Sequence, residues 1–341
     1  MTHEEHIYYY PLYSPIHFLT FLRYCKPTAK IISEKTGGSK NWRTIMADMI
    51  WSNIRYGAMD SRDYLLFEFW KNSSIERECY FTKRRYFKLI KHFDKRTFCH
   101  PDGKAWIYKK YSDFIKRDWI LVDQNTPSSI IYDFFLKHNE VLIKPLSSEQ
   151  GQGISIIKGD DLSKIEEIKD FSRKHPVLLE ELCKNCEYLD AINKSSLNTL
   201  RITTIVNNND KISIICACLR CGCNNSVVDN WGAGGVSYPI DLDSGLVYGP
   251  GIDKKGNKHI VHPGTSINMP GFEIPRFKEA CRMAVDIIEK DRNVVFAGLD
   301  IAILPDRVEL IEVNFPAGHD MIQAVHQKGI NAIMNTVKKS K

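Results

Sequence analysis

The spacing of apolar residues changes about a third of the way along the chain. Up to about residue 100, apolar and aromatic residues recur at helical spacing, and helices are expected over 45–54 and 64–70, with a break at Gly57. From about residue 101, short apolar runs of β type alternate with amphipathic segments. The pattern predicts a mostly helical N-terminal region over 1–100, followed by an α+β domain over 101–341.

The second region is expected to fold through antiparallel hairpins. Successive β-type runs follow one another without a helix between them, which is typical of α+β proteins and not of repeated βαβ units. Strands are expected over 141–144, 154–158, 177–182, 199–206 and 212–219, and helices over 161–174 and 275–289.

Composition and charge indicate an ordinary soluble protein. The 341 residues are 43% hydrophobic and 26% charged, with a formal net charge of +6. No apolar run reaches the ~18 residues of a membrane helix, and the acidic start Met1-Thr2-His3-Glu4 is unlike a secretory signal, so a cytoplasmic protein is expected. The basic aromatic run 83–92 fits a nucleic-acid or lipid-phosphate contact, but more often such a run is a helix with a solvated basic face, and no nucleic-acid partner is expected.

Ten cysteines raise the question of a metal site. Cys216 and Cys218 lie in an apolar β-type run, and Cys221 and Cys223 follow without a loop to turn them back. Zinc ligation needs four donors that converge, whereas cysteine on a buried strand packs as a small hydrophobic residue. We expect this cluster to hold no metal.

A candidate Mg²⁺ site lies in a predicted hairpin over 294–314. Pairing Leu304 with Val308 across the Pro-Asp turn puts Asp300 opposite Glu312, with Asn314 on the same face. Carboxylate and amide oxygens are ligands that Mg²⁺ takes. The facing carboxylates have no basic residue close in sequence, so the hairpin is expected to need a cation. A solvated hairpin with chance acids is the alternative.

A glycine-rich loop, Ser147-Ser148-Glu149-Gln150-Gly151-Gln152-Gly153, lies between two expected strands. Small residues let backbone N–H groups approach phosphate oxygens, and Lys144 at the strand end can reach a phosphate held there. The loop is not a dinucleotide fingerprint, a Walker A loop or a kinase glycine loop, because it opens a strand and follows its lysine. An ordinary turn with a surface lysine remains the alternative.

The order of these features resembles the ATP-grasp superfamily, in which two α+β halves clasp ATP. The order is lysine, glycine hairpin, helix, an apolar strand ending in Glu180-Glu181, and a distant hairpin with the metal residues. The resemblance covers about 101–335 and is greatest to the sugar-transfer-associated ATP-grasp family. The motifs that carry it are Asn198-Thr199-Leu200-Arg201, Val228-Asp229-Asn230-Trp231-Gly232-Ala233-Gly234-Gly235, His262-Pro263, Gly298-Leu299-Asp300 and Glu312-Val313-Asn314. It implies a smaller nucleotide-clasping subdomain over about 101–185 and a larger subdomain over 186–341.

The resemblance implies a role for each matching residue. Lys104 and Lys144 match phosphate-binding lysines, with Ser147, Gln150, Gly151 and Gly153 in the phosphate loop. Glu180, Glu181 and Cys183 match the adenine hinge, the last two through backbone groups, and Glu187 matches the ribose acceptor. Asp300, Glu312 and Asn314 match ligands of two Mg²⁺ ions. Asp229, Asn230 and His262 are candidate substrate residues.

One departure concerns the arginine that related ligases often carry two residues before the first metal aspartate. Here that position is Gly298, and Arg201 or Arg220 is expected to supply the missing charge; either is alternatively a structural ion-pair residue. The implied activity is an ATP-dependent carboxylate–amine ligase working through an acyl phosphate, on small-molecule or sugar-linked substrates and alongside glycan-biosynthesis enzymes. The alternatives are a kinase on the same fold and a nucleotide-binding scaffold that docks on a glycosyltransferase.

Overall fold

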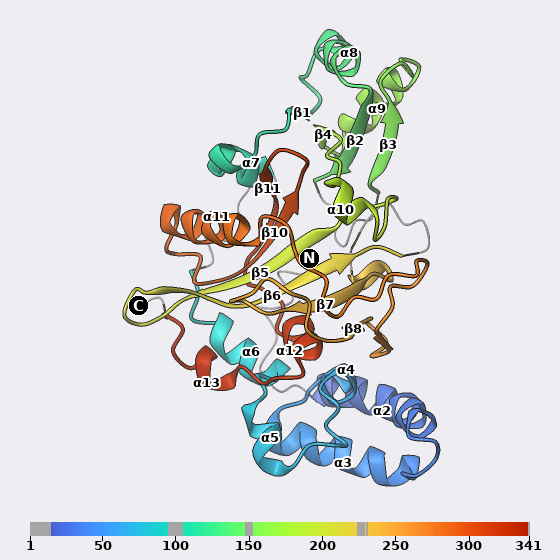
Figure 1. Cartoon of the computed structure of the whole chain (residues 1–341), viewed down its shortest axis with the longest axis vertical. Helices are drawn as coiled ribbons and strands as arrows, with labels where there is room; N and C mark the ends of the chain where they lie inside the picture. Colours follow the sequence, from blue (N-terminus) through green and yellow to red (C-terminus); the bar gives the residue numbers. More distant parts are fainter. Residues whose placement is uncertain (1–14, 95–104, 147–152, 224–228, 230, 340–341) are drawn as a thin grey trace.

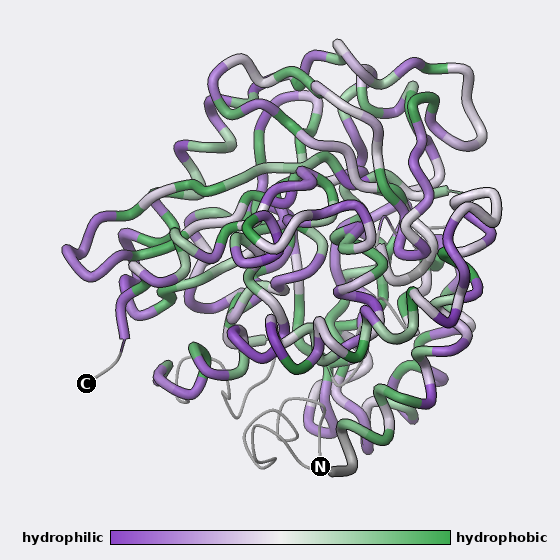
Figure 2. Tube along the Cα trace, turned by 90° about the horizontal axis from the view of Figure 1, so that it is seen from below, coloured by the Kyte–Doolittle hydropathy of each residue, from purple (hydrophilic) through white to green (hydrophobic). Residues whose placement is uncertain are grey.

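The computed structural model describes residues 15–94, 105–146, 153–223, 229 and 231–339. Its parts are stacked along the long axis of the molecule, with a small sheet at one end, a large sheet in the middle and the N-terminal helices at the other end (Figure 1). Hydrophobic residues run through the central segments, and the peripheral helices alternate between hydrophobic and polar residues (Figure 2). Among the described residues, no helix is long and apolar enough to cross a bilayer.

The N-terminal region is helical, as its periodicity predicts. Its helices are α2 (Pro15–Lys35), α3 (Trp42–Tyr56), α4 (Ser61–Leu66), α5 (Ser74–Cys79) and α6 (Lys83–Ile90). Local sequence explains their ends. Asn41 caps α3 by accepting a hydrogen bond from the N–H of Arg43, and Gly57 ends it in the left-handed conformation at φ 79°. The helix expected over 64–70 lies further toward the N-terminus, because Asp60 caps α4 and Phe67 ends it.

The basic run 83–92 is a solvated face only in its second half, because Lys88 and Lys91 are exposed whereas Lys83, Arg84 and Arg85 are half-buried. Lys83 Nζ lies 3.2 Å from Asp60 Oδ2, and Arg84 donates to the backbone oxygens of Asn53 at 2.6 Å and Ile54 at 3.0 Å. Arg85 donates to the Tyr80 oxygen at 2.6 Å. These half-buried cations hold α6 against the preceding helices, because each finds an acceptor within the region.

The N-terminal helices are joined to the large sheet through α12 (Asp320–His326). The fully buried amide of Gln323 accepts from the Phe81 N–H at 2.7 Å and donates to the Phe81 oxygen at 3.0 Å. His319 Nε2 lies 3.0 Å from the buried Asp63 carboxylate. Burial lowers the pKa of His319, but the charge of Asp63 outweighs it and raises the pKa, which favours an ion pair. One continuous hydrophobic core therefore spans the N-terminal helices and the large sheet.

The small sheet has its own core. Its strands are ordered β1 (Trp119–Val122), β4 (Val177–Glu181), β2 (Glu140–Pro145), β3 (Ser155–Lys158), all antiparallel. Helices α8 (Ser128–Lys137) and α9 (Lys164–Ser172) cover one face with Ile131, Phe134, Phe135, Ile165 and Ile168. The short helices α7 (Ala105–Lys110) and η2 (Ser112–Phe114) precede β1. The separate core is compatible with the expected boundary near 185, which remains a prediction, as does the boundary near 100.

The large sheet is also wholly antiparallel and confirms the α+β prediction. Its order is β11 (Val308–Asn314), β10 (Phe296–Ile303), β5 (Thr199–Val206), β6 (Ile212–Cys221), β7 (Val236–Ile240), β8 (Gly251–Ile252), β9 (Lys258–His259). Helix α11 (Phe277–Lys290) covers β5, β6 and β10, and α12 lies under β6, β7 and β8 (Figure 1). The remaining short helices are α10 (Glu187–Asp190), η3 (Trp231–Ala233) and α13 (Asn331–Met334).

Candidate active site

The predicted metal hairpin forms, with a different turn from the one expected. Val308 pairs with Ile303, and the Leu304 N–H donates to the Arg307 oxygen at 2.8 Å, so the pairing of Leu304 with Val308 was wrong. A β-bulge between Asp300 and Ile301 then shifts the register by one residue. The shift restores the alignment that matters, because Asp300 lies opposite Glu312, as predicted.

Asp300 is neutralised within the protein by two arginines that are distant from it in the sequence. Arg201 Nε and Nη2 donate to its two carboxylate oxygens at 2.5 and 2.9 Å, and Arg220 Nη1 donates at 2.7 Å. Asn314 Nδ2 adds a contact at 3.3 Å. Burial raises the pKa of Asp300, but the two guanidinium charges outweigh it, and the pKa is lowered. Asp300 is thus an anion at neutral pH.

Strand pairing explains how these arginines reach Asp300. In the register of β10 with β5, Arg201 on β5 lies directly opposite Asp300. In the register of β5 with β6, Arg220 on β6 lies opposite Thr199. A Cβ built on Gly298 would lie 3.0 Å from Arg201 Cδ. The Arg201 side chain therefore occupies the space beside position 298. The expectation that Arg201 supplies the charge missing at that position remains a prediction.

Arg220 extends the network to Asp229. Its Nη2 donates to Asp229 Oδ1 at 3.0 Å, and the Asp229 carboxylate also accepts from the N–H of Thr199 at 3.1 Å and from the Thr199 hydroxyl. Burial raises the pKa of Asp229, which Arg220 partly offsets. Asp229 therefore fixes Arg220 in place, and any contact it makes with a substrate would compete with these bonds.

The other candidate substrate residues are not joined to this network by the observed contacts. His262 is buried, with Nε2 3.1 Å from the Gly222 oxygen and 3.7 Å from Cys223 Sγ, and burial lowers its pKa. A neutral imidazole held in this way is a core histidine in the present structure. Asn230 lies outside the described residues.

Lys144, predicted to bind phosphate, is buried on β2 and carries its charge. Its Nζ lies 3.6 Å from Glu180 Oε1 and 3.3 Å from the Tyr108 hydroxyl. Burial lowers the pKa of Lys144, but the charge of Glu180, followed by Tyr108 and Glu312, raises it well above its ordinary value. Glu312 affects the pKa of Lys144 because the two residues lie near each other. The predicted phosphate lysine of the small sheet is thus close to a predicted metal ligand of the large sheet.

Sequence reasoning missed the residues that hold Lys144 and Glu180. The Tyr108 hydroxyl donates to Glu180 Oε1 at 2.6 Å, and Arg117 Nε donates to Glu180 Oε2 at 2.8 Å. Arg117 also binds Glu309 Oε1 at 3.1 Å and the Leu310 oxygen at 2.8 Å. One arginine therefore connects β4 of the small sheet to β11 of the large sheet. The only hint in the sequence is that Arg117 lies two residues before the strand that begins at Trp119.

The predicted adenine hinge is only partly available. Each oxygen of Glu180 already accepts a hydrogen bond, although a carboxylate has about four lone-pair sites and can accept more. The Glu181 N–H donates to the Asp118 oxygen at 2.9 Å, so its carbonyl is the group it would offer to adenine. Cys183 is half-buried beside a cavity of about 370 Å³, and Glu187 is exposed at the start of α10.

Most of the predicted phosphate loop lies outside the described residues, namely Ser147, Gln150 and Gly151, and so does the predicted phosphate-binding Lys104. Gly153 is described and has φ +73°, where a Cβ would lie 3.2 Å from Pro145 Cγ. Glycine suits this position because the chain returns from the loop to β3 in a left-handed conformation.

The cysteine cluster is a set of buried thiols in and after β6. Cys216, Cys218 and Cys221 lie on the strand and Cys223 directly follows it. Burial raises the pKa of the Cys216 and Cys218 thiols to about 12, which disfavours the thiolate that a metal requires. The expectation that these residues bind no metal remains a prediction.

The chain matches the sequence model of the sugar-transfer associated ATP-grasp family over residues 114–339. No curated protein matches it. Similar solved structures include D-alanyl-alanine synthetase A from Vibrio cholerae, at 14% identity and a TM-score of 0.39 over 70% of this chain and 61% of that chain. Another is N5-carboxyaminoimidazole synthetase from Staphylococcus aureus complexed with ADP, at 11% identity and a TM-score of 0.42 over 70% and 50%.

A third is D-alanine–D-alanine ligase from Bacillus anthracis complexed with ATP, at 12% identity and a TM-score of 0.39 over 69% of this chain and 65% of that chain. The chain therefore spans about half to two thirds of the length of these proteins. The family match covers most of the chain, and the antiparallel sheets with the hairpin of Asp300 and Glu312 are the architecture that the motifs predict. The chain belongs to the sugar-transfer associated ATP-grasp family and has the fold of that family.

Proposed function

We propose that the protein is an ATP-dependent carboxylate–amine ligase that works through an acyl phosphate. The observation that carries this proposal is the pair Arg201 and Arg220, which places two guanidinium groups beside Asp300, with Arg201 also lying against Gly298. A site that activates a carboxylate has to hold that carboxylate near the negatively charged γ-phosphate of ATP. Two guanidinium groups next to the predicted metal ligands provide such a site, because each can bind a carboxylate or phosphoryl oxygen at two points.

The donor set of the hairpin fits magnesium. Asp300, Glu312 and Asn314 present carboxylate and amide oxygens from neighbouring strands, as a hard cation requires. When bound with ATP, one or two Mg²⁺ ions would neutralise charge on the phosphoryl group during its transfer. Because both Asp300 oxygens are engaged by arginines, we infer that Arg201 exchanges Asp300 for the substrate carboxylate when metal and ATP bind.

The protein residues act on either side of the transferred group. Lys144, held protonated by Glu180, faces the phosphates from the small sheet, and Lys104 is proposed to do so as well. Arg201 and Arg220 orient the carboxylate from the large sheet. They then stabilise the oxyanion that forms when the amine attacks the acyl phosphate. The amide bond forms as the phosphate leaves, and the amine loses its proton to solvent or phosphate.

The family's association with sugar transfer supports a glycan-linked substrate. We propose that either the carboxylate or the amine is carried on a sugar, that the enzyme works beside glycan-biosynthesis enzymes, and that it does so in the cytoplasm, where ATP is supplied. The kinase alternative rested on the missing arginine at position 298. Since Arg201 fills that space, the ground for preferring a kinase is removed.

A product assay tests the reaction. With ATP, Mg²⁺ and a panel of amino acids, uronic acids and amino sugars, we expect ADP release to require both a carboxylate and an amine, and to yield an amide of matching mass. Chelation of Mg²⁺ should abolish it and weaken nucleotide binding in calorimetry. A phosphorylated product that persists without an amine would instead establish a kinase. Equally tight ATP binding in chelator would overturn the metal assignment of the hairpin.

Arg201→Lys should lower turnover at least tenfold, about 1.4 kcal/mol of transition-state stabilisation. Lysine keeps the charge beside Asp300 but loses the planar fork that grips a carboxylate. Steady-state kinetics and a thermal melt measure the two effects separately. The matched control is Arg292→Lys, at an exposed arginine paired with Glu289, which should change neither. A lower melting temperature with unchanged turnover would make Arg201 a structural residue.

A further inference from the structure

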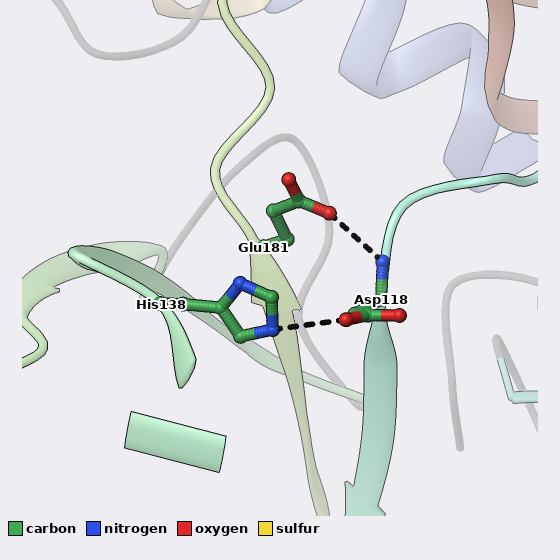
Figure 3. A group of neighbouring side chains, drawn as sticks. All are labelled: Asp118, His138 and Glu181. Carbon is green, nitrogen blue, oxygen red and sulfur yellow. Dashed lines mark hydrogen bonds and ion pairs between the residues drawn. The ribbon is translucent and has the colours of Figure 1, made fainter. Parts of the chain in front are cut away.

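Three potential metal ligands meet at one end of the small sheet, outside the network around Asp300 (Figure 3). Asp118 directly precedes β1, His138 follows the last residue of α8, and Glu181 is the last residue of β4. One ligand atom of each lies within 4.8 Å of the other two. Segments far apart in the sequence therefore bring one imidazole nitrogen and two carboxylates together.

The backbone fixes the two carboxylates side by side. Strands β1 and β4 are paired with Trp119 opposite Glu180, so the residues that flank this pair are neighbours. The Asp118 N–H donates to Glu181 Oε2 at 3.1 Å, and the Glu181 N–H donates to the Asp118 oxygen at 2.9 Å. Like charges held this close repel each other, and a cation bound between them would relieve that repulsion.

The imidazole of His138 points at these carboxylates without a hydrogen bond. Its side chain is 10% exposed, and the ring is held against Phe134 with their centroids 4.6 Å apart. Nε2 lies 3.2 Å from Asp118 Oδ2 but is not aligned for a hydrogen bond, and this buried nitrogen has no such partner among the described residues. An unsatisfied buried nitrogen is costly. Two ligands about 2.1 Å from a metal, at a tetrahedral angle, are separated by about 3.4 Å, close to the spacing observed here.

We propose that Asp118, His138 and Glu181 bind a divalent transition-metal ion of the zinc type. One imidazole nitrogen with two carboxylate oxygens suits Zn²⁺ or Mn²⁺, whereas Mg²⁺ prefers oxygen ligands alone. His138 and Glu181 also line the cavity of about 370 Å³ that extends to Cys183 and Asp306, which leaves room for water to complete the coordination. The bound ion would join the start of β1, the end of β4 and the end of α8. Its ligand Glu181 lies two residues before Cys183. This site does not depend on the proposed ligase activity.

Lys137 would compete with the ion for Asp118. Its Nζ is paired with Asp118 Oδ2, the oxygen that also faces His138, yet the Lys137 side chain is 65% exposed. An exposed ion pair contributes little, so the lysine can be displaced. Removing it should therefore tighten metal binding. If the three residues had only a structural role, the removal of Lys137 would give no increase in metal affinity.

The test is calorimetric titration of the metal-stripped full chain with Zn²⁺. We expect one site that His138→Gln and Glu181→Gln each weaken at least tenfold, and that Lys137→Ala tightens about two- to fivefold. The matched control is Asp306→Asn, an exposed acid in the wall of the same cavity, which should leave the affinity unchanged. Thermal melts of each variant check that it folds.

The same titration distinguishes this site from two other possible metal sites, the hairpin of Asp300 and Glu312 and the cysteine cluster in and after β6. Repeated in Glu312→Gln, zinc binding should persist, and its loss there would assign the ion to the hairpin and overturn the proposal. Co²⁺ in place of Zn²⁺ should give a spectrum without a thiolate charge-transfer band; such a band would assign the metal to the cysteines instead. Equal affinity in wild type and His138→Gln would equally refute the site.

Discussion

Asp300→Asn is expected to lower turnover about 10³-fold, about 4 kcal/mol of transition-state stabilisation, and also to destabilise the fold. The turnover falls because an anionic predicted ligand of Mg²⁺ is lost. The fold is weakened because Arg201 and Arg220, with side chains 14% and 6% exposed, lose a shared counter-ion. Breaking a buried pair from one side costs about 3–5 kcal/mol. Urea unfolding and steady-state kinetics on the same preparation measure the two losses.

Glu312→Gln is the informative comparison, because it replaces the residue opposite Asp300 on the hairpin. Glu312 is half-buried on the neighbouring strand, so its replacement should remove turnover to a similar degree with a much smaller loss of stability. Asp306→Asn, at the exposed turn of the same hairpin, should affect neither. If Glu312→Gln lowers the free energy of unfolding as much as Asp300→Asn does, the proposed difference between the two carboxylates is wrong.

Arg117→Met is expected to destabilise the protein by about 3–5 kcal/mol. The side chain is 2% exposed and binds two carboxylates, Glu180 and Glu309, that are equally buried. Methionine fills much of the volume but leaves Glu180 with the Tyr108 hydroxyl and, as its cation, Lys144 at 3.6 Å. Chemical denaturation gives the free energy of unfolding. Because Arg117 connects the two sheets, the variant should also broaden the unfolding transition, as the sheets begin to unfold separately.

Arg307→Met is the matched control. Arg307 binds the same Glu309 at 2.8 Å, but from the turn of the hairpin, where its side chain is 34% exposed. An ion pair with this exposure contributes about 1 kcal/mol or less. If Arg307→Met lowered the free energy of unfolding as much as Arg117→Met, the loss of either partner of Glu309 would explain the destabilisation. The contact of Arg117 with Glu180 would then contribute nothing further.

The Arg117 cluster also sets a pH dependence. Burial raises the pKa of Glu180, but Lys144 and Arg117 outweigh it and bring the pKa down to about 2. A carboxyl group with a depressed folded-state pKa stabilises the fold above its ordinary pKa near 4.5 and loses that contribution as the pH falls toward 2. In Arg117→Met the depression is smaller. The difference in stability between the variant and wild type should therefore narrow as the pH falls from 5 toward 2.

Features with a local cause were predictable from sequence. The hairpin of Asp300 and Glu312 follows from two β-type runs about one turn apart, and its pairing held even though the turn differs, because a bulge compensates for the shift. The end of α3 at Gly57 follows from glycine's access to positive φ. The partial burial of Lys83, Arg84 and Arg85 in α6 was not predicted, because acceptors such as Asp60 are set by how neighbouring helices pack, and helical spacing alone does not contain that information.

The sequence by itself determined the helical N-terminal region, the antiparallel α+β domain, the order of the ATP-grasp motifs and the alignment of the metal hairpin. These depend on periodicity and turn chemistry within a few residues. Only the tertiary structure decided which charges meet. Arg201 and Asp300 are 99 positions apart, and Arg117 and Glu309 are 192 apart. A buried charge must find a partner, but strand order decides which one, and that order follows from packing the whole chain at once.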